Sequence, residues 1–162
     1  MEFSEVQPKK YSPEQAWLKI CKWCAYQERS QQEVRDKLFS YGLYGSDVEN
    51  MIARLITEKF LSEERFAIAY AEGKFRQLGW GKVKIRQALK FKKVSAYCIL
   101  KALQSIPDTE YRSRLAKLLE KKEKEAGEKD PVRRYYKLYR YALSRGYEAD
   151  YIQDFLRDRA DG

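Results

Sequence analysis

Lysine and arginine side chains gather between Gly73 and Pro107, where they could bind phosphate groups through charge. This stretch contains no Asp or Glu. Its cations are Lys74, Arg76, Lys82, Lys84, Arg86, Lys90, Lys92, Lys93 and Lys101. The whole chain has 33 Lys and Arg against 24 Asp and Glu, so this stretch accounts for the entire net charge of +9. A positive field focused on one surface favours a polyanion, and nucleic acid is the first candidate.

A helix over residues 82–94 would present these cations together. Ile85, Ala88 and Leu89 form one apolar stripe at helical spacing. The cations that then share an adjoining face are Lys82, Arg86, Lys90 and Lys93. Like charges at this spacing repel one another, so a polyanionic partner would relieve the repulsion. The alternative is a solvated face without a function, although such faces usually mix both signs.

A second basic surface is predicted near the end of the chain, since no acid lies between Pro131 and Tyr147. Its cations are Arg133, Arg134, Lys137, Arg140 and Arg145. Interleaved with them are Tyr135, Tyr136, Tyr139 and Tyr141. Aromatic rings among cations can stack on unpaired bases, which favours single strands. Tyrosines can equally fill the core of a helical unit, so both interpretations stay open.

Groups for catalysis or metal binding are scarce. The chain has no His, which removes the commonest general base and zinc ligand. Cys21 and Cys24 have Cys-x-x-Cys spacing, but no second ligand pair accompanies them, so we interpret them as packing residues. Gly79 and Gly81 lack the further residues of a phosphate loop and predict a break between helices. We therefore expect no enzymatic activity, no metal and no cofactor.

The expected location is the cytoplasm. No run approaches the roughly 18 apolar residues that cross a bilayer, and the first residues do not resemble a signal peptide. The three cysteines, Cys21, Cys24 and Cys98, suit a reducing compartment. We expect a monomer with no membrane contact.

Helix starts and apolar positions recur with a period. Ser12 followed by Pro13 predicts one helix start, and Ser30 and Ser46 each begin a capping-box pattern that predicts another. A shift of 51 residues carries ten apolar positions between residues 16 and 55 onto apolar positions between residues 67 and 106. A shift of 104 carries seven positions between residues 34 and 52 onto positions between 138 and 156, including Gly42 onto Gly146.

This repetition predicts an all-α fold of three tandem three-helix repeats that form an elongated array, because no stretch shows strand alternation. The expected divisions are a loose lead-in over residues 1–12, then repeats over 13–61, 62–107 and 108–162. The third repeat should open with a long helix over 109–126. Asp130 and Pro131 predict the start of the next helix.

Three motifs in order carry a family resemblance. They are Ser30-x-x-Glu33-Val34-Arg35-x-Lys37-Leu38, then Phe60-Leu61-x-Glu63-x-Arg65-Phe66-Ala67-x-x-Tyr70, then Gly81-x-x-x-Ile85-Arg86-x-x-Leu89. These motifs resemble the bacterial RecX family of recombination regulators, and the resemblance extends from about Pro13 to Asp158. Where that family commonly has an acidic residue and a Gly, this chain has Ala88 and Lys93. Both departures make the stretch more basic, and the second leaves the helix end at Lys93 open.

The resemblance implies a non-enzymatic regulator of homologous recombination and DNA repair. Its partners would be the RecA recombinase filament, single-stranded DNA and, more weakly, duplex DNA. It would restrain ATP hydrolysis and strand exchange by the recombinase. The basic stretch supports nucleic-acid contact independently of the resemblance.

Two other functions compete with this one. A three-helix unit with a basic second helix can resemble a helix-turn-helix, which would make the chain a free-standing transcription regulator. Specific reading of bases would need Arg, Asn or Gln aimed from one helix, whereas Lys predominates in the basic stretch. An enzyme acting on nucleic acid would need clustered carboxylates for metal ions, and the basic stretch contains none.

Overall fold

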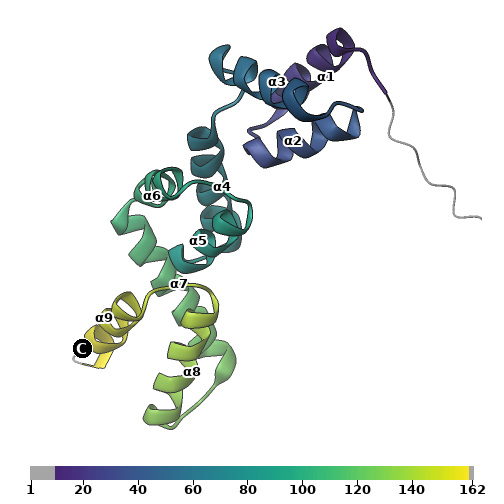
Figure 1. Ribbon diagram of the computed structural model, residues 1–162. Coiled ribbons are helices and arrows are strands. Elements are labelled where there is room, and N and C mark those ends of the chain that lie inside the picture. The colour runs from purple at the N-terminus through teal and green to yellow at the C-terminus, as the bar shows by residue number, and fades with distance from the viewer. Residues whose placement is uncertain (1–9, 161–162) are drawn as a thin grey trace, which may run out of the picture. The chain divides into compact units, whose positions relative to one another are not determined.

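Helices make up all the regular secondary structure in residues 10–160, the part of the chain that the computed structural model describes (Figure 1). They are α1 (Pro13–Tyr26), α2 (Gln31–Ser40), α3 (Gly45–Thr57), α4 (Glu63–Leu78), α5 (Lys82–Phe91), α6 (Ala96–Gln104), α7 (Asp108–Ala126), α8 (Pro131–Ser144) and α9 (Ala149–Ala160). The prediction of an all-α fold is confirmed. In this part of the chain, no helix is both long and apolar enough to span a membrane.

The predicted repeat pattern coincides with burial. In each of the first two repeats, nine of the ten aligned apolar positions are buried. The exceptions, Trp17 and Ile68, occupy equivalent positions and are both half-buried. In the third repeat, Leu138, Ala142 and Ile152 are buried as expected. The recurrence therefore reflects one three-helix design used three times.

The chain divides into two compact units, which we describe separately. The first contains the described residues up to Phe66 together with Lys92–Val94, and the second contains Ala67–Phe91 and the residues from Ser95 onward. The core of the first unit lies among α1, α2 and α3 and includes Val34, Leu38 and Leu55.

Side chains at the start of the first unit extend this core. The predicted loose lead-in falls mostly outside the described residues, but Tyr11 packs edge-on against Tyr41 with ring centroids 5.4 Å apart. The backbone N–H of Tyr11 donates to the Tyr41 carbonyl at 3.0 Å. The chain just before α1 is thus attached to the end of α2.

Two of the three helix starts predicted for the first unit are correct. Ser12 and Gln15 form a capping box at α1, and the Ser30 hydroxyl accepts a hydrogen bond from the Glu33 N–H at 3.0 Å at α2. The prediction that Ser46 caps α3 is wrong. α3 begins at Gly45, and the Asp47 N–H donates to the Tyr44 carbonyl at 3.2 Å, so Ser46 already lies inside the first turn.

In the second unit, the start of α5 is held by atoms of the third repeat. The Gly81 N–H donates to the Arg145 carbonyl at 2.8 Å, and the Val83 N–H donates to the Gly146 carbonyl at 2.9 Å. The Lys82 N–H donates to the Tyr111 hydroxyl at 2.9 Å. The first N–H groups of a helix need partners outside that helix. Here the carbonyls of the α8–α9 turn and the Tyr111 hydroxyl supply them, because Gly81, the residue before the helix, has no side chain to do so.

This contact requires two glycines. A Cβ atom at Gly81 would lie 2.3 Å from the carbonyl carbon of Gly146, and a Cβ atom at Gly146 would lie 2.4 Å from the Cβ of Lys84. Gly146 also has a φ of +93°, a conformation that side chains other than glycine rarely adopt. The sequence predicted a helix break at Gly81, and the structure shows why glycine stands there.

Tyr111 organises the core on the other side of this contact. Its side chain is fully buried, and its ring packs against those of Phe75 and Tyr147, at centroid distances of 5.9 and 5.0 Å. Its hydroxyl donates to the Glu148 carboxylate while accepting from Lys82. Burial, reinforced by the bond to Glu148, raises the pKa of Tyr111 far above its ordinary value. The hydroxyl therefore stays protonated as a donor.

Replacing Gly81 with Ala should destabilise the second unit by about 1–3 kcal/mol, because the new Cβ atom must push the α8–α9 turn away. The matched control is Gly73→Ala in the interior of α4, where nothing lies within 4 Å of the added atom. That change should raise the free energy of unfolding by about 0.5–1 kcal/mol through helix propensity. Urea denaturation measures both. Equal effects of the two substitutions would contradict the close contact.

Replacing Cys24 with Ala should lower the free energy of unfolding by at most about 3 kcal/mol, because Cys24 is a buried packing residue of α1. Burial raises the pKa of its thiol to about 11. Cys24 should therefore react slowly with iodoacetamide at pH 8 in the folded protein and quickly in the urea-unfolded protein. Mass spectrometry of the alkylated protein gives the rates. Stoichiometric zinc in protein purified without added metal would contradict a packing role for Cys21 and Cys24.

Candidate nucleic-acid interface

Helix α5 presents the central part of the predicted basic surface. Ile85 and Leu89 are fully buried, as their spacing predicted. Arg86 and Lys90 are exposed, one turn apart on the same helix. Neither of these two side chains has an ion-pair partner among residues 10–160. They are available for an external anion.

Lys82 begins this face but is constrained more than its neighbours. Its side chain is half-buried, and its ammonium lies 4.8 Å from the centroid of the Tyr111 ring. A cation over an aromatic face is held by the ring quadrupole. The same ring thus orients Lys82 while its hydroxyl accepts from the backbone N–H of that residue.

The predicted fourth member of the stripe, Lys93, does not belong to it. α5 ends at Phe91, three residues earlier than predicted, so Lys93 lies beyond the helix. Its φ is +62°, the left-handed conformation that usually ends a helix at a glycine. The helix therefore ends as it would with Gly, and Lys bears the conformational strain. Lys92, in the same turn, is half-buried, whereas Lys93 is exposed.

Trp80 gathers two further cations at the turn between α4 and α5. The ammonium groups of Lys74 and Lys84 lie 5.1 and 4.7 Å from the centroid of the Trp80 ring. Lys74 also lies 5.4 Å from the Tyr70 ring centroid. Sequence reasoning selected both lysines but assigned Trp80 no part. The sequence signal that could have identified Trp80 was an aromatic residue between nearby lysines, because ammonium groups pack favourably over aromatic rings.

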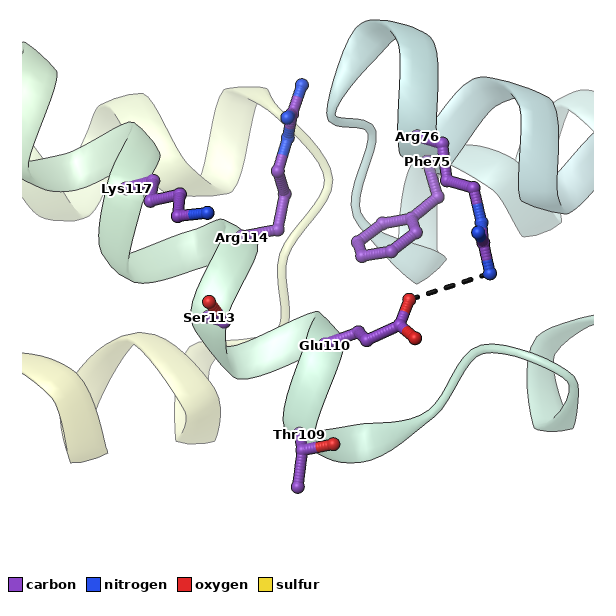
Figure 2. Close-up of a pocket in the computed structure, with 7 residues that line it drawn as sticks. All are labelled: Phe75, Arg76, Thr109, Glu110, Ser113, Arg114 and Lys117. Atoms are coloured by element: carbon purple, nitrogen blue, oxygen red, sulfur yellow. Dashed lines mark ion pairs between the residues drawn. The ribbon is translucent and has the colours of Figure 1, made fainter.

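Arg76 is directed away from this group. Its guanidinium pairs with Glu110 at 3.5 Å across a cavity of about 360 Å³ between α4 and α7, which Figure 2 shows. Arg114 and Lys117, also on the wall of this cavity, are cations that the sequence did not single out. Since Glu110 offsets one charge, Arg76 contributes less free positive charge than predicted.

The basic surface on α8 is also partly neutralised. Lys137 donates to the Glu128 carboxylate at 2.8 Å, and this bond lowers the pKa of Glu128 below its ordinary value. Arg133 lies 3.7 Å from Asp130. Both acids precede Pro131, so the acid-free run in the sequence did not reveal them. Among the predicted cations of α8, Arg140 is exposed and Arg134 is half-buried.

The α8 tyrosines divide between the two proposed roles. Tyr135 and Tyr136 are exposed, whereas Tyr139 and Tyr141 are half-buried. The rings of Tyr135 and Tyr139 stack at a centroid distance of 6.1 Å and an interplanar angle of 12°. The hypothesis that a base stacks here therefore rests on Tyr135 and Tyr136 alone.

Two family models match this chain. Residues 62–103 match the second three-helix domain of RecX, and residues 109–156 match the third. These segments coincide with α4–α6 and α7–α9. Together they cover more than half of the chain.

Several proteins named Regulatory protein RecX are similar in sequence. The chain is 25% identical to that of Bacillus mycoides over 148 residues, which are 91% of this chain and 55% of the relative. It is 31% identical to that of Clostridium tetani over 130 residues, or 79% of this chain and 59% of the relative. For Clostridium perfringens the identity is 30% over 131 residues, with coverage of 80% and 61%. The chain therefore spans little more than half the length of these relatives.

Two solved structures share the fold. RecX from Lactobacillus salivarius has a TM-score of 0.83 at 20% identity, covering 90% of this chain and 95% of that one. A second structure, of regulatory protein RecX, has a TM-score of 0.79 at 19% identity, covering 90% and 71%. With matching domain models, similar sequences and the same helical repeats, the chain belongs to the RecX family.

Proposed function

We propose that this chain is a non-enzymatic regulator of homologous recombination and DNA repair, which binds the RecA recombinase filament on single-stranded DNA. Binding lowers ATP hydrolysis and strand exchange by the recombinase. The observation that carries the strand contact is the acid-free face of α5, where Arg86 and Lys90 are exposed and unpaired among the described residues. We propose the recombinase as the partner because the chain belongs to the RecX family, and the inhibition is the effect that the family resemblance implies.

The strand contact is expected to be independent of base sequence. Lysine is a point charge on a flexible stem, and contacts of this kind to phosphate position a protein without reading bases. On α5, Lys82, Lys84 and Lys90 outnumber Arg86. A regulator that must follow a recombinase along any strand requires this indifference to sequence.

The transcription-regulator alternative fits the structure of α5 less well. A recognition helix reads base edges with residues near its N-terminus. In this unit, that end of α5 is covered by the α8–α9 turn, which accepts from Gly81 and Val83. Reading of bases by α5 would require the turn to detach.

Reversing the charge of Arg86 and Lys90, as Arg86→Glu with Lys90→Glu, should weaken binding to oligo(dT) at least about ten-fold at low salt. If about five phosphates are contacted, the slope of log K against log salt should be about −3.5 for the wild type and about −2.1 for the variant, from about −0.7 per contact. Fluorescence anisotropy of a labelled strand measures both. Helix content should not change, because both side chains are exposed.

The matched control reverses two exposed lysines of α7, as Lys121→Glu with Lys124→Glu. It changes the net charge equally and should leave the slope near the wild-type value. If both double variants weaken binding alike, net charge and not the α5 face is responsible.

Affinity should be higher for a recombinase-coated strand than for the bare strand or the recombinase alone. Two weak contacts, one to phosphate and one to protein, make the second engagement intramolecular, which can raise affinity by about 100-fold. Addition of this chain to the filament should lower ATP turnover, measured by a coupled assay. A footprint at one preferred duplex sequence, with unchanged recombinase activity, would favour the transcription-regulator alternative.

A further inference from the structure

A groove between α5 and α6 lies beside the basic face and has an apolar floor. Its volume is about 250 Å³, and it is lined by Arg86, Lys90, Ala96, Ile99, Leu100 and Leu103. All of these residues belong to the second unit. Ile99 and Leu103 are buried core residues, so the floor of the groove is the outer edge of the core itself.

Large apolar side chains are exposed on α6, and one of them, Leu100, lines the groove. Leu100 is 54% exposed, and Tyr97, one turn earlier on the same helix, is 60% exposed. The buried side of α6 carries Cys98, Ile99, Ala102 and Leu103. Large apolar side chains that adjoin one another on a protein surface mark an interaction site. Within the described chain, Tyr97 and Leu100 are left uncovered.

The rim of the groove is purely cationic. The aliphatic stems of Arg86 and Lys90 form part of its wall, and their charged ends can reach solvent above it. Lys101 on α6 is also exposed, 5.6 Å from the Tyr97 ring centroid, but it does not line the groove. The sequence from Gly73 to Pro107 supplies no carboxylate to balance them. The complementary ligand is an apolar group next to negative charge.

Protein fits this combination better than nucleic acid. Unpaired bases are held mainly by stacking on aromatic rings, whereas this floor is made of Ala96, Ile99 and Leu103. Phosphate groups need only the cations and gain nothing from an aliphatic floor. A buried apolar anchor inside a charged rim is instead the usual arrangement of a protein–protein contact.

We propose that this groove binds a segment of the recombinase that inserts one apolar side chain between Leu100 and the stems of Arg86 and Lys90. Carboxylates beside the inserted side chain pair with the two cations at the rim. The proposal rests on the proposed function, since it assigns the protein contact of the filament complex. On a bare strand Arg86 and Lys90 hold phosphates. On a coated strand they pair with carboxylates, and other cations of the basic stretch, such as Lys74 and Lys84 beside Trp80, keep the contact to phosphate.

The test is Leu100→Ser, which removes the apolar anchor without changing any charge. Binding is measured by anisotropy to labelled oligo(dT), bare and coated with RecA recombinase in the presence of a slowly hydrolysed ATP analogue. The variant should lose about ten-fold or more in affinity for the coated strand and keep wild-type affinity for the bare strand. The control is Leu143→Ser on α8, where Leu143 is 44% exposed and distant in sequence, and it should bind both forms like the wild type.

A second probe does not depend on the recombinase. A short blocked peptide with a central leucine between glutamates should shift the amide resonances of residues 86–103 in the wild type and shift them less in the Leu100→Ser variant. A peptide with serine at the centre should shift them less in either protein.

Each other outcome overturns the proposal in a different way. Equal weakening on bare and coated strands would assign the groove to the strand. Loss of self-association in sedimentation would assign it to a second copy of this chain. If the wild type binds the coated strand and the Leu100→Ser variant binds it equally well, the groove proposal is wrong and the proposed function stands. If the wild type itself does not bind the coated strand, the proposed function is wrong.

Discussion

The second unit depends on one backbone-to-backbone contact, in which the turn before α5 meets the turn before α9. Gly81 and Gly146 allow two main chains to approach where any Cβ atom would collide. The N–H groups at the start of α5 are satisfied by Arg145 and Gly146 carbonyls and by the Tyr111 hydroxyl. Because unsatisfied buried N–H groups are costly, this arrangement holds α5 in one position. The start of the basic helix is thus held by two backbone carbonyls and one tyrosine hydroxyl, and among residues 10–160 no carboxylate accepts from its first N–H groups.

Burial with helical periodicity is the part of this fold that sequence could predict. Positions such as Val34, Ile85 and Leu138 recur because each repeat must bury the same apolar stripe. The regular spacing of such a stripe can be detected in the sequence alone. Tyr111 was not predicted, since the long first helix of the third repeat fits no single shift. The pairing of Gly81 with Gly146 could not be predicted either, because it joins turns in different repeats and leaves no local pattern.

The candidate interface was predicted in composition but not in detail. Sequence identifies which residues carry charge, whereas pairing depends on where distant acids lie in space. Arg76 pairs with Glu110, and Lys137 pairs with Glu128. Both acids lie outside the acid-free segments of the sequence in which the cations were counted. Lys93 illustrates a different limit of sequence reasoning. The helical spacing of apolar and cationic residues continues through Lys93, but the backbone there has a left-handed conformation and the helix has already ended. Charge counting therefore overstated the α8 surface and extended the α5 face by one residue.

Helix α5 carries three different surfaces within ten residues. Ile85 and Leu89 fill the core, the charged ends of Arg86 and Lys90 face solvent, and the stems of the same two side chains border the α5–α6 groove. Long cationic side chains can serve two surfaces at once, because one residue offers an apolar stem to one partner and a charged end to another. Phosphate contact alone would hold any strand, coated or bare, with little discrimination. In the proposed complex, an apolar side chain in the groove beside the same cations supplies the discrimination, since a phosphate group gains nothing from an aliphatic floor.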